Sequence, residues 1–331
     1  MRKKLPIKKK ILLIRFSAIG DIVLTTPVIR CLKKQLGVEI HYLTKQSYQH
    51  ILAPNPYIDK IYAIKKRIGE VSHQLKEEQY DGIIDLHKNL RSFLVKLNLP
   101  FTKSYSFNKL NFEKWLLVNF KINRLPQKHI VDRYFEALSA LNVQNDGLGL
   151  DFFVPEKNIT LPVNLPTNYI ALVIGAGKHT KAPTNKKWQE IINTIKQPIL
   201  LLGGPAEKEK ASDLIQLLSP INKSNITNLV GQINLMQSAY CVQQADMVIT
   251  GDTGLMHIAA AFQKPIISIW GNTVPDFGMY PYYGNQIDQH RVVEVEGLSC
   301  RPCSKIGFDV CPKGHFKCIE EINTRSLDIP V

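Results

Sequence analysis

Residues 247–273, MVITGDTGLMHIAAAFQKPIISIWGNT, place a strand, a sharp turn, a helix and a second strand in close succession. Apolar Met247–Thr250 predicts a short buried strand, Leu255–Phe262 predicts a helix, and Pro265–Trp270 predicts the next strand. The turn between the first strand and the helix directs the free N–H groups of the helix, and its positive dipole end, toward whatever lies above the sheet. The segment therefore predicts a parallel α/β sheet with a ligand-binding edge.

The composition of this turn suits a ligand that carries both phosphates and sugar hydroxyls. Thr253 and Gly254 are small enough to let a ligand approach the backbone. We expect the backbone N–H groups of Thr253, Gly254 and Leu255 to bind phosphate, and the carboxylate of Asp252 to accept from hydroxyls. From these residues alone, an ordinary turn in which Asp and Thr cap the helix is the alternative.

The alternation of strand and helix runs through the chain in two stretches. The first begins with the strand Ile11–Arg15 and the helix Ile22–Leu36, and a segment rich in Gly and Pro, Asn145–Thr167, ends it. The pattern resumes at Tyr169–Ile174. A chain of 331 residues is long enough for two domains. We predict an α/β protein with two doubly wound domains, residues 1–155 and 156–331.

Polar residues follow several of the predicted strands. Open α/β sheets bind ligands at the carboxyl ends of their strands. We therefore expect Asp21, Arg91, Glu207 and Asp252 to contribute to one site, although they are far apart in the sequence.

The net charge of +14 is concentrated at the start of the chain, where six positive residues lie within the first ten. A short basic tail suits an anionic membrane surface, and a solvated tail that keeps the protein soluble is the alternative. No basic face interleaved with aromatic residues indicates a nucleic-acid partner. No apolar run is long enough for a signal peptide or a membrane span, so we expect a cytoplasmic protein with at most peripheral contact with the inner membrane.

Four of the six cysteines form the cluster Cys300-x2-Cys303-x7-Cys311-x6-Cys318. In a cytosolic protein such a cluster favours metal binding or free thiols over disulfides. Only one Cys-x2-Cys pair is present, and the later spacings differ from the commonest zinc ribbons. A structural zinc ion, structural thiols without metal and an adventitious disulfide therefore all stay open.

Taken together and in order, six segments of the chain resemble the heptosyltransferases of glycosyltransferase family 9. They are ILLIRFSAIGDIVLTTPVIRCLKK, DLHKNLRS, NKKWQEII, LLGGPAEKE, GDTGLMHIAAAFQKPIISIWGNT and the cysteine-bearing tail CRPCSKIGFDVCPKGHFKC. Each segment is weak by itself, whereas the ordered set covers nearly the whole chain.

The resemblance implies the GT-B fold, in which two Rossmann-like domains face each other across a cleft. It implies an acceptor-binding first domain, a nucleotide-sugar-binding second domain, and inverting transfer of heptose from ADP-heptose to the lipopolysaccharide inner core, on a lipid A–Kdo or heptosyl acceptor. It implies no metal in catalysis and no other cofactor, and the absence of an Asp-x-Asp motif agrees with this. A family member with another donor or acceptor is the alternative. An NAD enzyme is disfavoured because the turn after the first strand is not Gly-x-Gly-x-x-Gly.

The resemblance also suggests roles for individual residues. Asp21 matches the proposed general base, Lys186 the lysine that binds the diphosphate, and Glu207 the acid that accepts from ribose hydroxyls. Asp252 is expected near the donor sugar or diphosphate, and Arg91 near acidic groups of the acceptor. His257 lies one helical turn after Thr253. It either reaches the ligand site or has a structural role in the core or at the helix cap. The unusually basic loop Lys178–Thr184 departs from the family pattern.

Overall fold

The structure is a computed structural model that describes residues 9–327 and 329. The residues Arg2–Lys8 of the basic tail, for which membrane contact is predicted, lie outside the described residues. None of the described helices has the length and apolar character needed to cross a membrane. The chain divides into two compact units, Met1–Lys109 with Lys128–Phe153, and Leu110–Gln127 with Val154–Val331.

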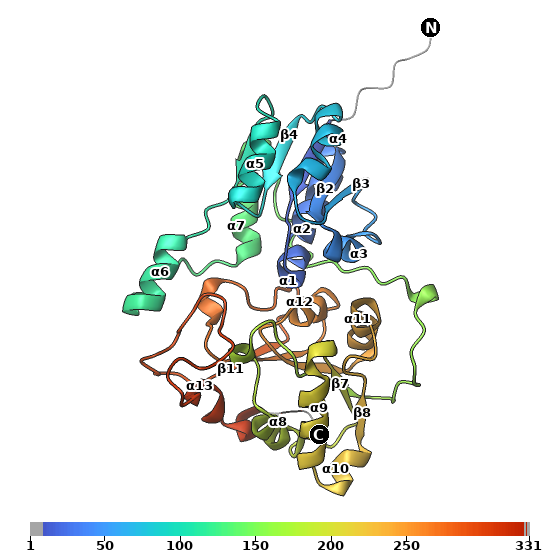
Figure 1. The fold of residues 1–331 in the computed structure, drawn as a ribbon, viewed down its shortest axis with the longest axis vertical. Coiled ribbons are helices and arrows are strands. Elements are labelled where there is room, and N and C mark those ends of the chain that lie inside the picture. Colours follow the sequence, from blue (N-terminus) through green and yellow to red (C-terminus); the bar gives the residue numbers. More distant parts are fainter. Residues whose placement is uncertain (1–8, 328, 330–331) are drawn as a thin grey trace. The chain divides into compact units, whose positions relative to one another are not determined.

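The first unit is built on a five-stranded parallel sheet in the order β3-β2-β1-β4-β5. Its central strands are apolar and buried, since helices cover both faces (Figure 1). The strands are β1 (Lys10–Ile14), β2 (Glu39–Lys45), β3 (Lys60–Ile64), β4 (Gly82–Asp85) and β5 (Ser104–Ser106). The helices are α1 (Ile19–Val23), α2 (Thr26–Leu36), α3 (Gln49–Leu52), α4 (Ser72–Glu77), α5 (Leu90–Asn98) and α7 (Ile130–Glu136).

The predicted helix Ile22–Leu36 is wrong in one respect, because two helices occupy this part of the chain. The helix α1 ends at Val23, and α2 begins at Thr26 with Pro27 in its first turn. Proline lacks an N–H group and its ring crowds the preceding turn, so it fits the start of a helix and breaks its interior. Asp21 lies in the first turn of the short α1, the helix that follows β1.

The second unit repeats the architecture with six parallel strands in the order β11-β10-β9-β6-β7-β8. The strands are β6 (Ile170–Val173), β7 (Ile199–Leu202), β8 (Ile226–Asn228), β9 (Met247–Gly251), β10 (Ile266–Trp270) and β11 (His290–Glu294). The helices are α8 (Asn185–Ile192), α9 (Lys208–Leu217), α10 (Pro220–Ser224), α11 (Leu235–Gln244), α12 (Gly254–Ala261) and α13 (Lys317–Glu320). A buried apolar cluster that includes Trp188, Ile249 and Ile319 joins the sheet to its helices.

Helix α6 (Asn111–Phe120) belongs to the second unit, although residues 1–155 were predicted as one domain. Its Leu117 packs with Val274 and Phe277, and the ammonium group of Lys121 donates to the carbonyl of Pro302 at 2.7 Å. The chain thus enters the second unit before it completes the first. The chain returns to the first unit at Lys128 and leaves it a second time after Phe153, two residues before the predicted boundary at residue 155.

Candidate active site

Both parallel sheets have the strand order of a dinucleotide-binding fold. In each unit, successive strands are first added on one side of the first strand and then on its other side, which creates a topological switch point. In the first unit this switch point lies between β1 and β4, and in the second unit between β6 and β9. Loops on either side of such a point diverge and leave a crevice at the carboxyl ends of the strands. The residues that follow these four strands are therefore the candidates for ligand binding.

Asp21 lies at the switch point of the first unit and is held in place by Arg15, which directly follows β1. A guanidinium nitrogen of Arg15 lies 2.5 Å from Asp21 Oδ1, and the backbone N–H of Ala18 donates to Asp21 Oδ2 at 3.1 Å. Arg15 also donates to the carbonyl of Leu86, which follows β4, and to the hydroxyl of Tyr134 on α7. A buried arginine thus ties both strands of the switch point to a carboxylate that is itself one quarter exposed.

His87, in the loop after β4, and Arg91, in the first turn of α5, meet on the ring of Phe16, which follows β1. The Phe16 and His87 rings pack edge to face at 5.3 Å, and the Arg91 guanidinium lies 5.5 Å from the Phe16 centroid. Burial, reinforced by the charges of Arg15 and Lys109, lowers the pKa of His87 to about 4. His87 is therefore a neutral imidazole at neutral pH.

Arg91 also lines a cavity of about 660 Å³ that lies within the first unit. Its other basic lining residues, Lys66 and Arg67, come from the loop after β3, and Leu90 and Leu94 of α5 add apolar surface. A cavity with several cations and an apolar wall suits a ligand with acidic groups and a hydrocarbon part.

In the second unit, the turn after β9 has the form that the sequence predicts. Thr253 is the N-cap of α12, and its hydroxyl accepts from the backbone N–H of Met256 at 3.3 Å. Asp252 stands beside this helix start, where its Oδ2 lies 2.5 Å from Lys181 Nζ and accepts from the Thr273 hydroxyl at 3.2 Å. The helix N-terminus and Lys181 form an electropositive site, and Asp252 carries the counter-charge.

The loop that carries Lys181 packs directly on the ends of two strands. Gly251 ends β9 and Gly271 follows β10, and a side chain at either position would strike the backbone carbonyl of Lys181 or Thr180, respectively. The two glycines therefore allow the close approach that brings Lys181 to Asp252.

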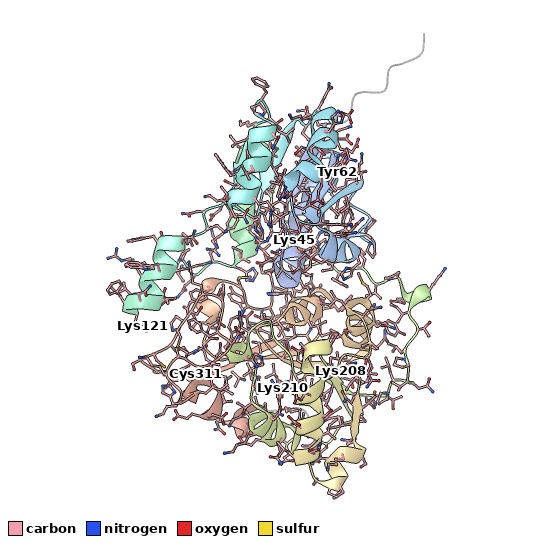
Figure 2. All side chains as sticks on the ribbon, in the orientation of Figure 1. Lys45, Tyr62, Lys121, Lys208, Lys210 and Cys311 are labelled. Carbon is pink, nitrogen blue, oxygen red and sulfur yellow. The ribbon has the colours of Figure 1, made fainter. Side chains whose placement is uncertain are left out.

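Glu207 follows β7 through the turn Gly203-Gly204. Its Oε2 accepts from the backbone N–H of Gly204 at 2.8 Å, and its carboxylate fills the space that a side chain on Gly175 would need. Gly175 follows β6, so Glu207 reaches the switch point of this unit. Lys210, labelled in Figure 2, lies behind it and donates to the carbonyls of Ile174 and Pro183, and burial lowers its pKa to about 8.

The remaining predicted residues lie farther from this edge. Lys186 is exposed on the first turn of α8, while its neighbour Lys187 is buried and donates to Glu190 and to the carbonyl of Ile322. His257 is only 2% exposed, inside α12. The lysine that contacts Asp252 is Lys181, for which the sequence offered only its place in a basic loop.

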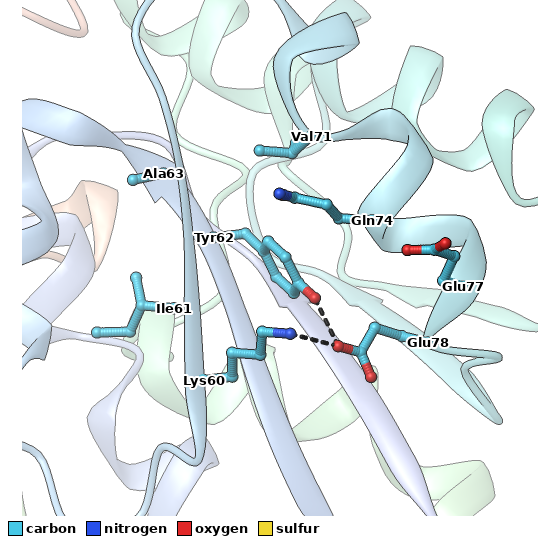
Figure 3. A pocket seen from close by; sticks show the side chains of 8 residues that line it. All are labelled: Lys60, Ile61, Tyr62, Ala63, Val71, Gln74, Glu77 and Glu78. Carbon is cyan, nitrogen blue, oxygen red and sulfur yellow. Dashed lines mark hydrogen bonds and ion pairs between the residues drawn. The ribbon is translucent and has the colours of Figure 1, made fainter.

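A second polar cluster surrounds Glu78, near the amino ends of β1, β2 and β3, and borders a cavity of about 480 Å³ (Figure 3). The Glu78 carboxylate lies 2.6 Å from Lys10 Nζ, Lys60 Nζ and the Tyr62 hydroxyl, and the hydrogen bond from Lys10 is the largest cause that lowers its pKa to about 2. Glu39, His41 and Glu78 have the spacing of cation ligands. Because two ammonium groups already neutralise these acids, we interpret this cluster as structural.

Comparisons with known proteins give the family of the chain. A sequence model of glycosyltransferase family 9 (heptosyltransferase) matches residues 68–307. Lipopolysaccharide heptosyltransferase 1 of Campylobacter coli is 27% identical over 291 residues, which cover 80% of this chain and 84% of the relative. Lipooligosaccharide heptosyltransferase 2 of Haemophilus influenzae is 24% identical and covers 94% of this chain and 99% of its own.

Solved structures show the same fold. The E. coli ADP-heptose lps heptosyltransferase II matches with a TM-score of 0.67 at 19% identity, and covers 94% of this chain and 98% of its own. The E. coli heptosyltransferase WaaC with ADP-2-deoxy-2-fluoro heptose matches with a TM-score of 0.63 at 19% identity, and covers 86% and 92%. The chain therefore has the GT-B fold. The chain belongs to glycosyltransferase family 9, the heptosyltransferase family.

Proposed function

We propose that this protein is an inverting heptosyltransferase that moves heptose from ADP-heptose to an acceptor of the lipopolysaccharide inner core. The observation that carries the proposal is the turn after β9, where Asp252, Lys181 and the N-terminus of α12 meet at the switch point of the second unit. The relatives named above are heptosyltransferases of lipopolysaccharide or lipooligosaccharide, and the solved WaaC structure contains an ADP-heptose analogue.

The second unit binds the donor in this proposal. The backbone N–H groups of Thr253, Gly254 and Leu255 and the ammonium group of Lys181 hold the diphosphate, and they also stabilise the charge that develops on it as it leaves. Glu207 accepts from the ribose hydroxyls. Because lysine and helix N–H groups supply the positive charge, no divalent metal is needed at the diphosphate.

The first unit supplies the acceptor and the base. The acceptor hydroxyl gives its proton to Asp21 while its oxygen bonds to the anomeric carbon of heptose. The bond from that carbon to the ADP oxygen breaks at the same time, and ADP leaves with the electron pair. Arg15 positions the Asp21 carboxylate, and proton transfer to a positioned base contributes about 10²–10⁴-fold in rate.

The cavity beside α5 is the proposed acceptor site. Lys66, Arg67 and Arg91 give it three cations, which match the carboxylates of Kdo and the phosphates of lipid A. The apolar side chains of Leu90 and Leu94 extend it toward a lipid.

Helix α5 also supports action at the cytoplasmic face of the inner membrane. Its outer side presents an exposed apolar stripe with helical spacing, formed by Leu90, Phe93, Leu94, Leu97 and the following Phe101. An apolar stripe flanked by basic residues is typical of helices that lie on anionic lipid surfaces. A Phe93→Ser, Leu97→Ser variant should bind phosphatidylglycerol vesicles more weakly than the wild type. The control Ile221→Ser, at an exposed apolar residue of α10, should not.

The decisive experiment is a panel of nucleotide sugars assayed with purified protein on lipid A–Kdo and on heptosyl acceptors. ADP-heptose should be consumed with release of ADP and with inversion at the anomeric carbon. Turnover of another nucleotide sugar, without turnover of ADP-heptose, would contradict the proposal and assign a different donor.

A further inference from the structure

The segment between β11 and α13, residues 295–316, contains no helix or strand and carries three of the four clustered cysteines. We call it the cysteine segment, and its fourth cysteine, Cys318, lies on α13 directly after it. Irregular loops longer than about 12–15 residues are uncommon in compact domains unless they serve a function or are held by a cross-link. The described residues of this segment form no disulfide, since all the cysteines are free thiols.

The fold brings the two ends of the cysteine segment together, so that Cys300 and Cys303 lie beside His315, just before Cys318. Cys303 Sγ donates to the carbonyl of Cys300 at 2.9 Å, and Cys300 Sγ lies 3.9 Å from His315 Nε2. Cys318 is only 5% exposed and lies on α13, three residues after His315. Within the described part of the chain, no three of the sulfur atoms lie within 4.8 Å of one another. A bound metal would therefore draw them together.

The surroundings match the charge of a metal–thiolate centre. A divalent ion with four thiolates carries a net negative charge. Lys121 Nζ donates to the carbonyls of Cys300 and Pro302, and Arg301 lies within the segment itself. Lys121 and Cys311 are both labelled in Figure 2. Lys121 thus places a cation beside the cluster, whereas Arg301 is paired with Glu294 at 2.5 Å.

The cysteine segment also holds the two loops that face Asp252. The carbonyl of Phe308 accepts from the backbone N–H of Thr180 at 3.1 Å, and Lys178 pairs with Asp309 at 2.8 Å. Arg301 donates to the carbonyls of Gly271 and Thr273 at 2.6 and 2.8 Å. Lys181 and Thr273, the two residues that contact Asp252, therefore both lie in loops that the segment holds.

We propose that Cys300, Cys303, Cys311 and Cys318 bind one thiophilic divalent metal ion, zinc or iron, and that this metal orders the loops around Asp252. Four thiolates in tetrahedral arrangement are the ligand set of structural zinc and of single iron sites. The metal takes no part in glycosyl transfer. Its effect on nucleotide binding rests on the proposed function, whereas its presence does not.

The test begins with the metal content of the full-length wild-type protein, purified under reducing conditions without chelator and measured by elemental mass spectrometry. About one equivalent of zinc or iron per chain is expected, and visible absorption would identify iron. Cys303→Ser and Cys311→Ser should each lose the metal. The control variants Cys31→Ser and Cys241→Ser, at buried cysteines outside the cluster, should keep it. Wild-type protein without metal, or a Cys303→Ser variant that retains a full equivalent, would overturn the proposal.

The second readout separates the metal from its effect on the site. Titration of the wild-type protein with a mercurial reagent should release the metal in proportion to the number of thiols modified, with release complete at four thiols. This experiment does not depend on variants that fail to fold. ADP affinity should fall at least about tenfold on release, as for loss of groups that support a metal site. Unchanged ADP affinity after release would refute the ordering role. Wild-type protein that holds the metal but never binds ADP would refute the proposed donor.

Discussion

Replacement of Lys181 by alanine, compared with the same change at Lys186, tests which lysine holds the donor diphosphate. Lys181 Nζ lies 2.5 Å from Asp252, with only 18% of its side chain exposed, at the N-terminus of α12. A hydrogen bond between charged groups contributes about 1.5–3 kcal/mol. Lys181→Ala should therefore weaken ADP binding by about 10–150-fold. Because phosphate is present in both the ground state and the transition state, KM should rise as well as kcat fall.

Lys186 is the matched control, since it lies on α8 and is exposed. Exposed charges are screened and typically contribute about 0–1 kcal/mol, so Lys186→Ala should change the Kd for ADP by less than about fivefold. Isothermal titration with ADP and steady-state kinetics on both variants give the answer. A larger loss at Lys186 than at Lys181 would refute our reasoning from the structure and favour the role that the family resemblance suggests. Full ADP affinity in both variants would place the donor elsewhere.

Three further predictions concern Asp21, the metal requirement of the transfer reaction and the buried His87. Asp21→Asn should lower kcat by about 10²–10⁴-fold and leave ADP affinity unchanged, because the base acts on the acceptor; near-normal kcat in a folded variant would make Asp21 a structural residue. Glycosyl transfer should gain nothing from Mg²⁺, and it should continue in EDTA while the metal of the cysteine segment stays bound, as its metal content would show. A loss of turnover that Mg²⁺ restores would contradict the role of Lys181 and the α12 N–H groups. Burial lowers the pKa of His87 to about 4 in the folded protein, below its usual 6.5 in an unfolded chain. As the pH falls from about 6.5 to about 4, His87 is protonated in the unfolded chain but not in the folded protein, so the free energy of unfolding decreases. The loss of stability is at most about 3 kcal/mol. The midpoint of urea unfolding should therefore shift less between pH 7 and pH 4.5 in His87→Gln than in the wild type. In the control His73→Gln, at an exposed histidine, the shift should equal that of the wild type.

Much of the fold could be predicted from the sequence because the strands are short, apolar and followed by punctuating residues. Strands β1, β6 and β9 end at Ile14, Val173 and Gly251, each within one residue of the predicted end. Periodicity could not reveal that α6 belongs to the second unit. That assignment depends on the contacts of Leu117 and Lys121 with residues more than a hundred positions later in the chain.

The candidate site shows the same limit. Asp252, Thr253 and Glu207 could be predicted, since each follows a strand within a recognisable turn. Lys181 could not be distinguished from its basic neighbours, because its position depends on the absence of side chains at Gly251 and Gly271, residues in other strands and loops. Arg15 directly follows an apolar strand, and this signal was available in the sequence. Its partners Leu86 and Tyr134 come from distant parts of the chain.

The pairing of Lys181 with Asp252 explains why a carboxylate lies where a diphosphate is expected to bind. Without a ligand, Asp252 neutralises the ammonium group of Lys181 and holds it 2.5 Å away, beside the positive end of α12. In the proposed function, a diphosphate carries more charge than one carboxylate and also interacts with the helix N–H groups, so we expect it to displace Asp252 from Lys181. Asp252 Oδ2 would then keep its hydrogen bond from Thr273, and the site that Lys181 leaves on this oxygen would become available to a hydroxyl of the donor sugar. In the proposed function, one exchange of partners would assign Lys181 to the phosphate and Asp252 to the sugar, and it would require the two loops that carry Lys181 and Thr273 to stay in place.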